Sequence, residues 1–280
     1  MSNEARAGVL IFGYTAEARC PDLRKRGSRL RVRPLFQPAI YPPHPMPRLL
    51  LLHGYTEDAS IFDPLRPLLP AQASLVDVGL EDALRQWPRG RPVHAGTVAG
   101  LLAERYAIGP DDVLLGHSMG GWLAAHIKQQ TGATAILLSS FTNQRKIVSS
   151  FRSLRVLGFL VKTGLLQSAY MRARFKRLYP FDESRAVHAA LTDGMVHHRR
   201  PYVYQQLQVL FAPAPELTAQ PELRLHARRD NIIRPPDEAY VEIPGDHFSH
   251  VLYPEPTAAA VRSFLESHWT RRPAPAAARL

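Results

Sequence analysis

The chain has 280 residues, of which 45% are hydrophobic and 21% charged, and its formal net charge at pH 7 is +11. This length and apolar content are enough for a sizeable buried core, and single α/β domains of this size are common. No apolar run approaches the ~20 residues that a membrane-spanning helix needs. The only cysteine, Cys20, excludes a disulfide framework and a cysteine zinc site. We therefore expect a soluble cytoplasmic protein.

The positive charge has two interpretations. Much of it comes from arginine, and the chain is also rich in proline and alanine, so the charge can reflect composition bias alone. A basic surface can also attract anionic substrates, membrane surfaces or nucleic acid. The sequence contains no interleaved aromatic and basic RNA-binding motif, no helix-turn-helix signal and no zinc spacing, so a nucleic-acid partner is not expected.

Short apolar runs predict the strands of a sheet. In chain order they span residues 8–12, 30–35, 48–52, 74–78, 113–115, 133–138, 223–227 and 239–243. Helical spacing of apolar residues predicts helices at about 94–106, from 119 onward and at 256–269. A further helix near 61–69 is opposed by Pro64 and Pro67, since proline is costly inside a helix. The alternation of strands with helices indicates a mostly parallel sheet with helices on both faces.

The pattern changes between residue 142 and about residue 213. This segment contains helical stretches, such as 147–166 and 202–211, and no convincing strand. We therefore predict one α/β core made of residues 1–141 and 215–270, with residues 142–214 inserted as a helical cap. Residues 271–280, rich in proline, alanine and arginine, are predicted to be disordered.

Ser118 lies between an apolar strand and a helical pattern, with Gly116 and Gly120 two residues to each side. This order is typical of a nucleophile elbow, whose strained backbone holds the serine hydroxyl above the sheet. Glycine is needed at both flanking positions because a Cβ there would collide with the neighbouring strand or helix. The turn also directs the N–H groups at the start of the helix toward the place where negative charge would develop.

A serine hydroxyl is a weak nucleophile without a base, and the base works best when a carboxylate orients it. No Asp or Glu occurs from Gly132 to Pro180, so no carboxylate directly follows the strand at 133–138. Asp230 follows the next predicted strand, and His247 follows the last one. Both loops are expected at the same sheet edge as Ser118.

Structural interpretations of these residues stay open. Ser118 could sit in an inert glycine turn, Asp230 could cap a loop or helix, and His247 could be a surface histidine. Asp246 is the next candidate acid, although adjacent side chains rarely point at each other, and it adjoins His247. His250 is the competing histidine.

Four motifs in this order resemble the α/β-hydrolase fold superfamily, which includes serine esterases, lipases and thioesterases. They are His53-Gly54, Gly116 to Gly121, Asp230 with Ile232, Ile233 and Pro235 behind it, and Gly245 to Phe248 followed by Pro254-Glu255. The resemblance covers roughly residues 48–265. It implies an α/β-hydrolase fold with a cap, a Ser118 nucleophile, a His247 base and an orienting Asp230, without a metal or organic cofactor.

The resemblance also implies an oxyanion hole formed by the backbone N–H groups of Tyr55 and Met119. The supporting residues of the elbow and of the loop after the early strand are then His53, Gly54, Gly116, His117 and Gly120. The loop departs from the His-Gly-Gly-Gly run of many lipases and carboxylesterases, which weakens the case for bulky secondary or tertiary alcohol esters. Serine at position 118, rather than aspartate, argues against haloalkane dehalogenase or epoxide hydrolase chemistry.

The predicted cap is strongly basic between residues 142 and 180. Its basic residues, with no acidic residue among them, are Arg145, Lys146, Arg152, Arg155, Lys162, Arg172, Arg174, Lys176 and Arg177. Apolar residues alternate with them in an amphipathic helical pattern. Such a helix can simply pack its apolar face on the core and expose its basic face. Alternatively, the cap favours anionic acyl substrates or attracts the protein weakly to anionic lipid.

The sequence therefore predicts a serine hydrolase that cleaves a small-molecule ester or thioester of a small to medium acyl group. A lactonase, an amidase or a C–C bond hydrolase could use the same three residues. Two alternatives from other classes also stay open. One is a receptor-like protein that binds a ligand with little turnover, and the other is a basic surface-binding protein with a vestigial site.

Overall fold

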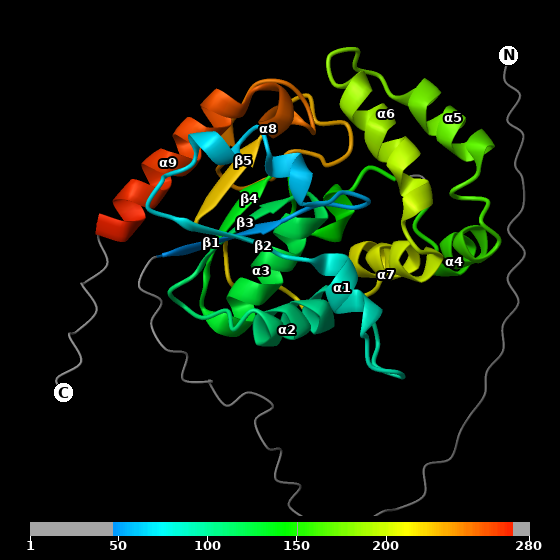
Figure 1. Ribbon diagram of the computed structural model, residues 1–280, viewed down its shortest axis with the longest axis horizontal. Helices are drawn as coiled ribbons and strands as arrows, with labels where there is room; N and C mark the ends of the chain where they lie inside the picture. Colours follow the sequence, from blue (N-terminus) through cyan, green and yellow to red (C-terminus); the bar gives the residue numbers. More distant parts are fainter. Residues whose placement is uncertain (1–46, 150, 271–280) are drawn as a thin grey trace, which may run out of the picture. The chain divides into compact units, whose positions relative to one another are not determined.

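A parallel sheet of six strands forms the centre of the computed structural model, which describes residues 47–149 and 151–270. The strands are β1 (Arg48–Leu52), β2 (Ser74–Asp77), β3 (Val113–His117), β4 (Thr134–Leu138), β5 (Leu223–His226) and β6 (Val241–Glu242). Their order in the sheet is β2-β1-β3-β4-β5-β6, and every pairing is parallel (Figure 1). The predicted α/β class is confirmed. The strands expected at 8–12 and 30–35, and the tail 271–280, lie outside the described residues.

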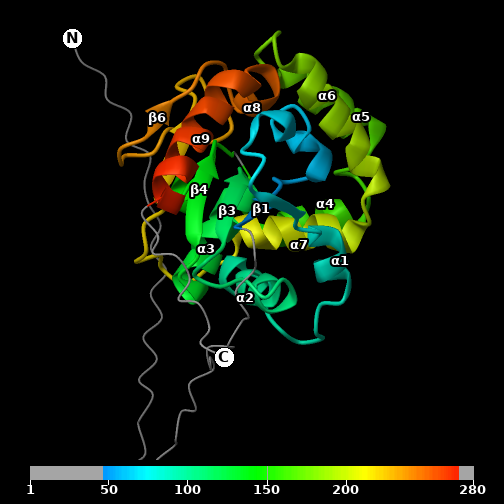
Figure 2. The ribbon, with the colours of Figure 1, turned by 60° about the vertical axis from the view of Figure 1, so that its left-hand side comes forward.

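The central strands are apolar on both faces because helices cover both faces of the sheet. Along β1, Leu50 and Leu52 pack into one buried cluster, whereas Leu49 and Leu51 pack into another. The helices on the first face are α2 (Ala95–Arg105) and α3 (Met119–Thr131), and the main helix on the second is α9 (Pro254–Thr270). Figure 2 shows α2 and α3 on the side of the sheet opposite α9.

The remaining described elements outside the segment between β4 and β5 are short. They are α1 (Leu80–Arg85), α8 (Ser249–Leu252) and the 3-10 turns η1 (Ala59–Phe62) and η2 (Arg66–Leu68). The predicted helix at 61–69 is therefore wrong. Pro64 and Pro67 cannot donate the hydrogen bonds of a continuous helix, so the segment forms two separate turns.

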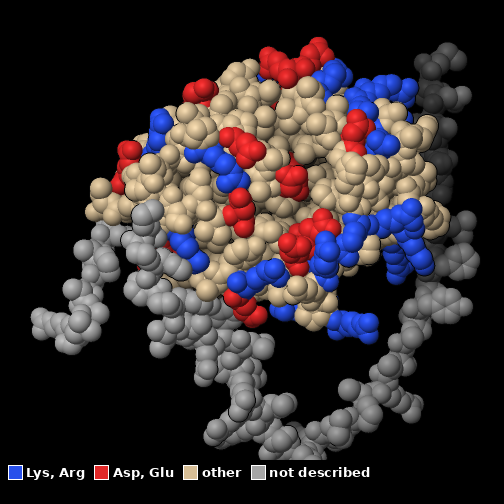
Figure 3. Space-filling view, viewed as in Figure 1, with Lys and Arg blue, Asp and Glu red and all other residues tan. Residues whose placement is uncertain are grey.

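Between β4 and β5, the described residues form several helices and no strand of the sheet. The helices are η3 (Gln144–Lys146), α4 (Leu154–Lys162), α5 (Ala169–Leu178), α6 (Arg185–Gly194), η4 (Met195–His197) and α7 (Arg200–Phe211). We call residues 142–214 the helical insertion. It has a small buried cluster of its own, in which α4 packs against α7. Figure 3 shows Lys and Arg side chains gathered over α4 and α5.

The helix expected at 147–166 is shorter than predicted. Ile147 instead forms an antiparallel bridge with Ile233, and the N–H of Val148 donates to the carbonyl of Ile232. This pairing keeps the start of the segment extended, so α4 begins only at Leu154. No helix in the described part of the chain is both long and apolar enough to cross a membrane.

Helix α3 approaches the sheet so closely that only glycine fits at the contact. A Cβ on Gly120 would lie 2.0 Å from the carbonyl oxygen of Leu52, and one on Gly116 would lie 2.4 Å from the carbonyl oxygen of Gly120. Both neighbours are backbone atoms and cannot rotate away. The two glycines of the predicted elbow thus fix the distance between α3 and strands β1 and β3.

We predict that Gly120→Ala lowers the free energy of unfolding by about 3 kcal/mol or more, because the new methyl group would force α3 away from β1. The matched control is Gly194→Ala at the end of α6, where an added Cβ meets no atom within 4 Å. This control should be neutral, or more stable by up to about 1 kcal/mol. Urea denaturation of both variants measures the difference, and equal stability would contradict the close approach.

Candidate active site

Ser118 links β3 to α3 in a strained backbone conformation. Its φ is 51° and its ψ is −118°, a region that a residue with a side chain rarely adopts. Its N–H donates to the carbonyl of Leu138 (3.0 Å), and its carbonyl accepts from the hydroxyl of Ser140 (2.6 Å). These bonds hold the turn in place. The structure therefore places a strained, buried serine at the carboxyl end of a central strand, as the glycine pattern predicts.

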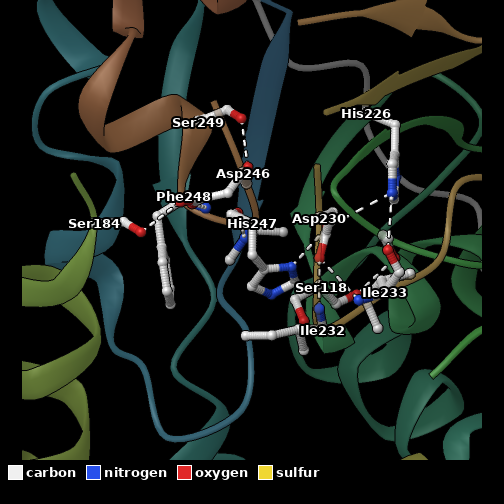
Figure 4. Close-up of polar contacts among 12 residues, drawn as sticks. Ser118, Ser184, His226, Asp230, Ile232, Ile233, Asp246, His247, Phe248 and Ser249 are labelled. Carbon is white, nitrogen blue, oxygen red and sulfur yellow. Dashed lines mark hydrogen bonds and ion pairs between the residues drawn. The ribbon is translucent and has the colours of Figure 1, made fainter. Parts of the chain in front are cut away.

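Asp230 lies in the loop after β5, where its carboxylate is fully partnered. One oxygen, Oδ1, accepts from the N–H groups of Ile232 (2.9 Å) and Ile233 (2.8 Å). The other, Oδ2, lies 2.8 Å from Nδ1 of His247 (Figure 4). Burial alone would raise the pKa of Asp230, but the charge and hydrogen bond of His247 and the Ile233 N–H together lower it. The carboxylate is thus ionised at neutral pH.

His247 follows β6 and is oriented by Asp230. Because Nδ1 donates to the carboxylate, Nε2 of the neutral ring can accept a proton. Burial would lower the pKa of His247, but the charge and hydrogen bond of Asp230 outweigh it and raise the pKa above its ordinary value of 6.5. The ring is therefore a stronger base than a free imidazole.

The loops of Ser118 and His247 lie side by side (Figure 4). His117, which precedes Ser118, has its Nε2 3.0 Å from the carbonyl oxygen of His247, and the two rings are 4.8 Å apart. Within the described residues, no hydrogen bond joins the Ser118 hydroxyl to His247. Such bonds are often long in enzymes without substrate and shorten when substrate binds.

The competing acid and histidine have other partners. Asp246 accepts from the Ser184 hydroxyl (2.5 Å) and the Phe248 N–H (3.0 Å), and it makes no described bond to the imidazole of its neighbour (Figure 4). His250 is completely buried, and neither of its ring nitrogens has a hydrogen-bond partner among the described residues. Burial holds the pKa of His250 well below 6.5. Of the two candidate acids, Asp230 and Asp246, only Asp230 makes a described hydrogen bond to the imidazole of His247.

A second histidine, which no sequence motif indicates, lies beside Asp230. His226 ends β5, and its Nε2 is 3.6 Å from Oδ2 of Asp230 and 3.1 Å from the carbonyl oxygen of Ile233. Burial lowers the pKa of His226 despite the nearby carboxylate, so its ring is neutral at neutral pH. The neutral His226 ring therefore packs against the Asp230 loop. It does not compete with His247 for the Asp230 carboxylate as a second positive charge would.

The two predicted oxyanion donors are backbone groups near Ser118. Met119 is the first residue of α3, so its N–H has no acceptor within the helix. Tyr55 lies in the loop after β1, residues 53–57, which we call the 53–57 loop. No loop, turn or cap hydrogen bond of the described residues uses either N–H. Both groups are thus free to bind a developing negative charge.

Sequence comparison decides the family, because the model of the Alpha/beta hydrolase family matches residues 49–277. The chain belongs to the alpha/beta hydrolase family. No curated protein matches its sequence. Across the described residues of this α/β-hydrolase, no group of three or more His, Cys, Asp and Glu side chains is arranged to hold a metal ion.

Solved structures share the fold of this α/β-hydrolase at low identity. An enol-lactonase from Burkholderia xenovorans is 16% identical, with a TM-score of 0.57, and the match covers 79% of this chain and 92% of that one. A thermophilic esterase from Thermogutta terrifontis is 17% identical, with a TM-score of 0.56 and coverages of 79% and 90%. A thioesterase of the prodiginine biosynthetic pathway of Streptomyces coelicolor is 18% identical, with a TM-score of 0.50 and coverages of 80% and 90%.

In this α/β-hydrolase, a buried pair connects the 53–57 loop to the two catalytic candidates. Glu57 accepts from the N–H of Gly54 (2.6 Å), and its Oε2 lies 2.9 Å from Nδ1 of His117. The other ring nitrogen of His117, Nε2, lies 3.0 Å from the carbonyl oxygen of His247, so the ring bridges Glu57 and the His247 loop. Burial would raise the pKa of Glu57, but the charge and hydrogen bond of His117 lower it overall. The sequence motifs predict a supporting role for His117, but none of them indicates Glu57.

The helical insertion also contacts the 53–57 loop. Thr56 has a φ of 56°, which is strained for a β-branched residue. Its N–H donates to Oε1 of Gln206 on α7 (2.8 Å), and its carbonyl oxygen lies 3.3 Å from Nε2 of His198. Gln206 is fully buried. Two insertion side chains thus hold the residue next to Tyr55.

A cavity of about 490 Å³ lies beside the 53–57 loop. Its lining includes His53, and Ser118 is not part of it. The acidic residues of the lining are Glu57, Asp58, Asp77, Glu81 and Asp82, against one basic residue, Arg85. The wall next to the candidate oxyanion donor is therefore acidic rather than basic.

We predict that Glu57→Gln lowers the free energy of unfolding by about 3 kcal/mol at neutral pH, because it replaces the buried carboxylate that binds both the Gly54 N–H and His117. The pKa of Glu57 lies below its ordinary value of 4.5 in the folded protein. The difference between wild type and variant should therefore be complete above pH 4.5 and shrink as the pH falls through the lowered pKa.

Denaturant titrations at several pH values measure this difference. The matched control is Glu242→Gln, which breaks the exposed pair between Glu242 and Arg228 (2.9 Å) and should cost no more than about 1 kcal/mol. A Glu57 variant as stable as this control would contradict a stabilising role for the buried contact between Glu57 and His117.

Proposed function

We propose that this α/β-hydrolase cleaves a carboxylic ester or thioester through an acyl-enzyme on Ser118, with His247 as general base and Asp230 as the orienting acid. The observation that carries the proposal is the 2.8 Å contact between Asp230 and His247 beside the strained Ser118. Family membership supports hydrolase activity. The esterase, enol-lactonase and thioesterase among the solved structures with this fold are consistent with acyl transfer.

Acylation uses the groups in a fixed order. The Ser118 hydroxyl attacks the substrate carbonyl while Nε2 of His247 takes its proton, and the imidazolium is stabilised by Asp230. The N–H groups of Tyr55 and Met119 bind the oxyanion of the tetrahedral intermediate, each contributing about 3 kcal/mol. His247 then gives its proton to the departing alcohol or thiol.

Deacylation repeats these steps with water as the nucleophile. His247 takes a proton from the water as its oxygen attacks the acyl-enzyme, and the tetrahedral intermediate collapses with the proton returning to Ser118. The products are a carboxylic acid and the free enzyme.

Ser118→Ala tests the nucleophile. We expect kcat for a short p-nitrophenyl ester to fall by about 10⁴-fold or more, and fluorophosphonate labelling to disappear, because no other group can form the acyl-enzyme. Ser153→Ala, an exposed serine before α4, should leave both unchanged. Retained turnover or labelling in the Ser118 variant would refute the mechanism.

Asp230→Asn tests the orienting acid through pH dependence. Asp230 raises the pKa of His247 above 6.5, so the acid limb of the wild-type kcat/KM profile should lie above pH 6.5. Without the carboxylate, burial dominates and the limb should move below pH 6.5, while kcat falls by about 10³- to 10⁴-fold. Asp246→Asn is the matched control and should cause smaller changes in both. A larger loss in the Asp246 variant would assign the acid role to Asp246 instead.

A further inference from the structure

The outer side of α4 is apolar although it faces solvent. Phe159 is 64% exposed and Val156 45% exposed, and Phe151, just before the helix, is 67% exposed. The opposite side of α4 packs Leu157 and Val161 into the buried cluster of the insertion. A surface helix of a globular protein normally has one apolar side. The second apolar side of α4 therefore lacks a partner in the described structure.

Basic residues lie next to these exposed apolar side chains of α4. Arg155 and Lys162 are exposed, lie on the same side of the helix as Phe159, and have no acidic partner among the described residues. Arg152 is also exposed, and its guanidinium contacts only backbone carbonyls. Figure 3 shows basic side chains over α4. We define the α4 surface as Phe151, Arg152, Arg155, Val156, Phe159 and Lys162.

These cations do not serve the cavity beside the 53–57 loop. None of the residues of the α4 surface lines that cavity, and its own lining is acidic. Selection of an anionic substrate there would therefore not explain the charge of the α4 surface. The exposed cations and phenylalanines together match a partner that is negatively charged and apolar at once.

We propose that the α4 surface docks on an anionic phospholipid bilayer. A helix with aromatic residues flanked by Arg and Lys lies in the plane of the interface, with its apolar side in the boundary between headgroups and acyl chains. Phe151 and Phe159 enter this boundary, and Arg155 and Lys162 contact the phosphates. The docking is reversible, because one short helix supplies few contacts. Docking extends the proposed function by bringing the hydrolase to a lipid surface. The docking itself does not depend on the proposed hydrolysis at Ser118.

Vesicle sedimentation tests the proposal with the full chain carrying Ser118→Ala, so that no lipid is hydrolysed. We expect binding to vesicles of phosphatidylcholine mixed with phosphatidylglycerol, weak binding to phosphatidylcholine alone, and weaker binding as the salt concentration rises. Equal binding to both vesicle types, or no binding to either, would overturn the proposal.

The charged arm of the test is Arg155→Gln with Lys162→Gln. Each cation near an anionic surface contributes about fivefold, so the pair should lower vesicle affinity by about 10- to 30-fold. The matched control is Arg89→Gln with Arg105→Gln, which removes the same charge from exposed positions outside the insertion. Equal losses in the two pairs would show a general charge effect and refute the α4 surface.

The apolar arm is Phe151→Ser with Phe159→Ser. Vesicle affinity should fall by about tenfold or more, while affinity for heparin, a soluble polyanion without an apolar phase, stays unchanged. Because both side chains are exposed, the melting temperature should also stay unchanged. Unaltered vesicle binding would overturn the proposal. A change in the sedimentation coefficient without vesicles would also overturn it, because it would show that the α4 surface binds a second copy of the chain. Failure of the proposed hydrolase activity would leave these results unaffected.

Discussion

The backbone strain at Ser118 depends on how closely α3 approaches the sheet. A residue with a side chain held at a φ of 51° costs about 1–3 kcal/mol, which the surrounding packing must offset. Gly116 and Gly120 allow the contact, and the hydrogen bonds of Ser118 to Leu138 and Ser140 lock the turn. The reactive hydroxyl is therefore positioned by the packing of α3 against the sheet, and the helix N-terminus is positioned with it.

His247 is held from two sides by buried polar side chains. Asp230 fixes the ring through Nδ1, and the pair of His117 and Glu57 fixes the backbone through the carbonyl of His247. Glu57 also binds the N–H of Gly54, so one carboxylate connects the 53–57 loop to the imidazole loop. Buried polar groups that are all partnered make a rigid site, because each would be costly to leave unpaired. The two loops therefore cannot move independently.

The sequence predicts features that depend on local pattern and misses those that depend on distant contacts. The strands, the elbow and the loop positions of Asp230 and His247 follow from apolar runs, glycines and chain order. Glu57 and Gln206 could not be predicted, since their partners lie 60 and 150 residues away in the chain. The error at 147–166 has the same origin, because an isolated bridge between Ile147 and the distant Ile233 overrides helical periodicity.

Helix α7 of the insertion contacts both the 53–57 loop, beside the acidic cavity, and the basic helix α4. On one side, Gln206 of α7 binds the backbone of Thr56 beside the acidic cavity. On the other, α4 and α7 share a buried cluster against which Tyr55 also packs. A displacement of α4 would therefore reach Tyr55, the candidate oxyanion donor, through this buried cluster. Close-packed interiors transmit such displacements, so packing couples α4 to the loop that carries the candidate oxyanion donor Tyr55.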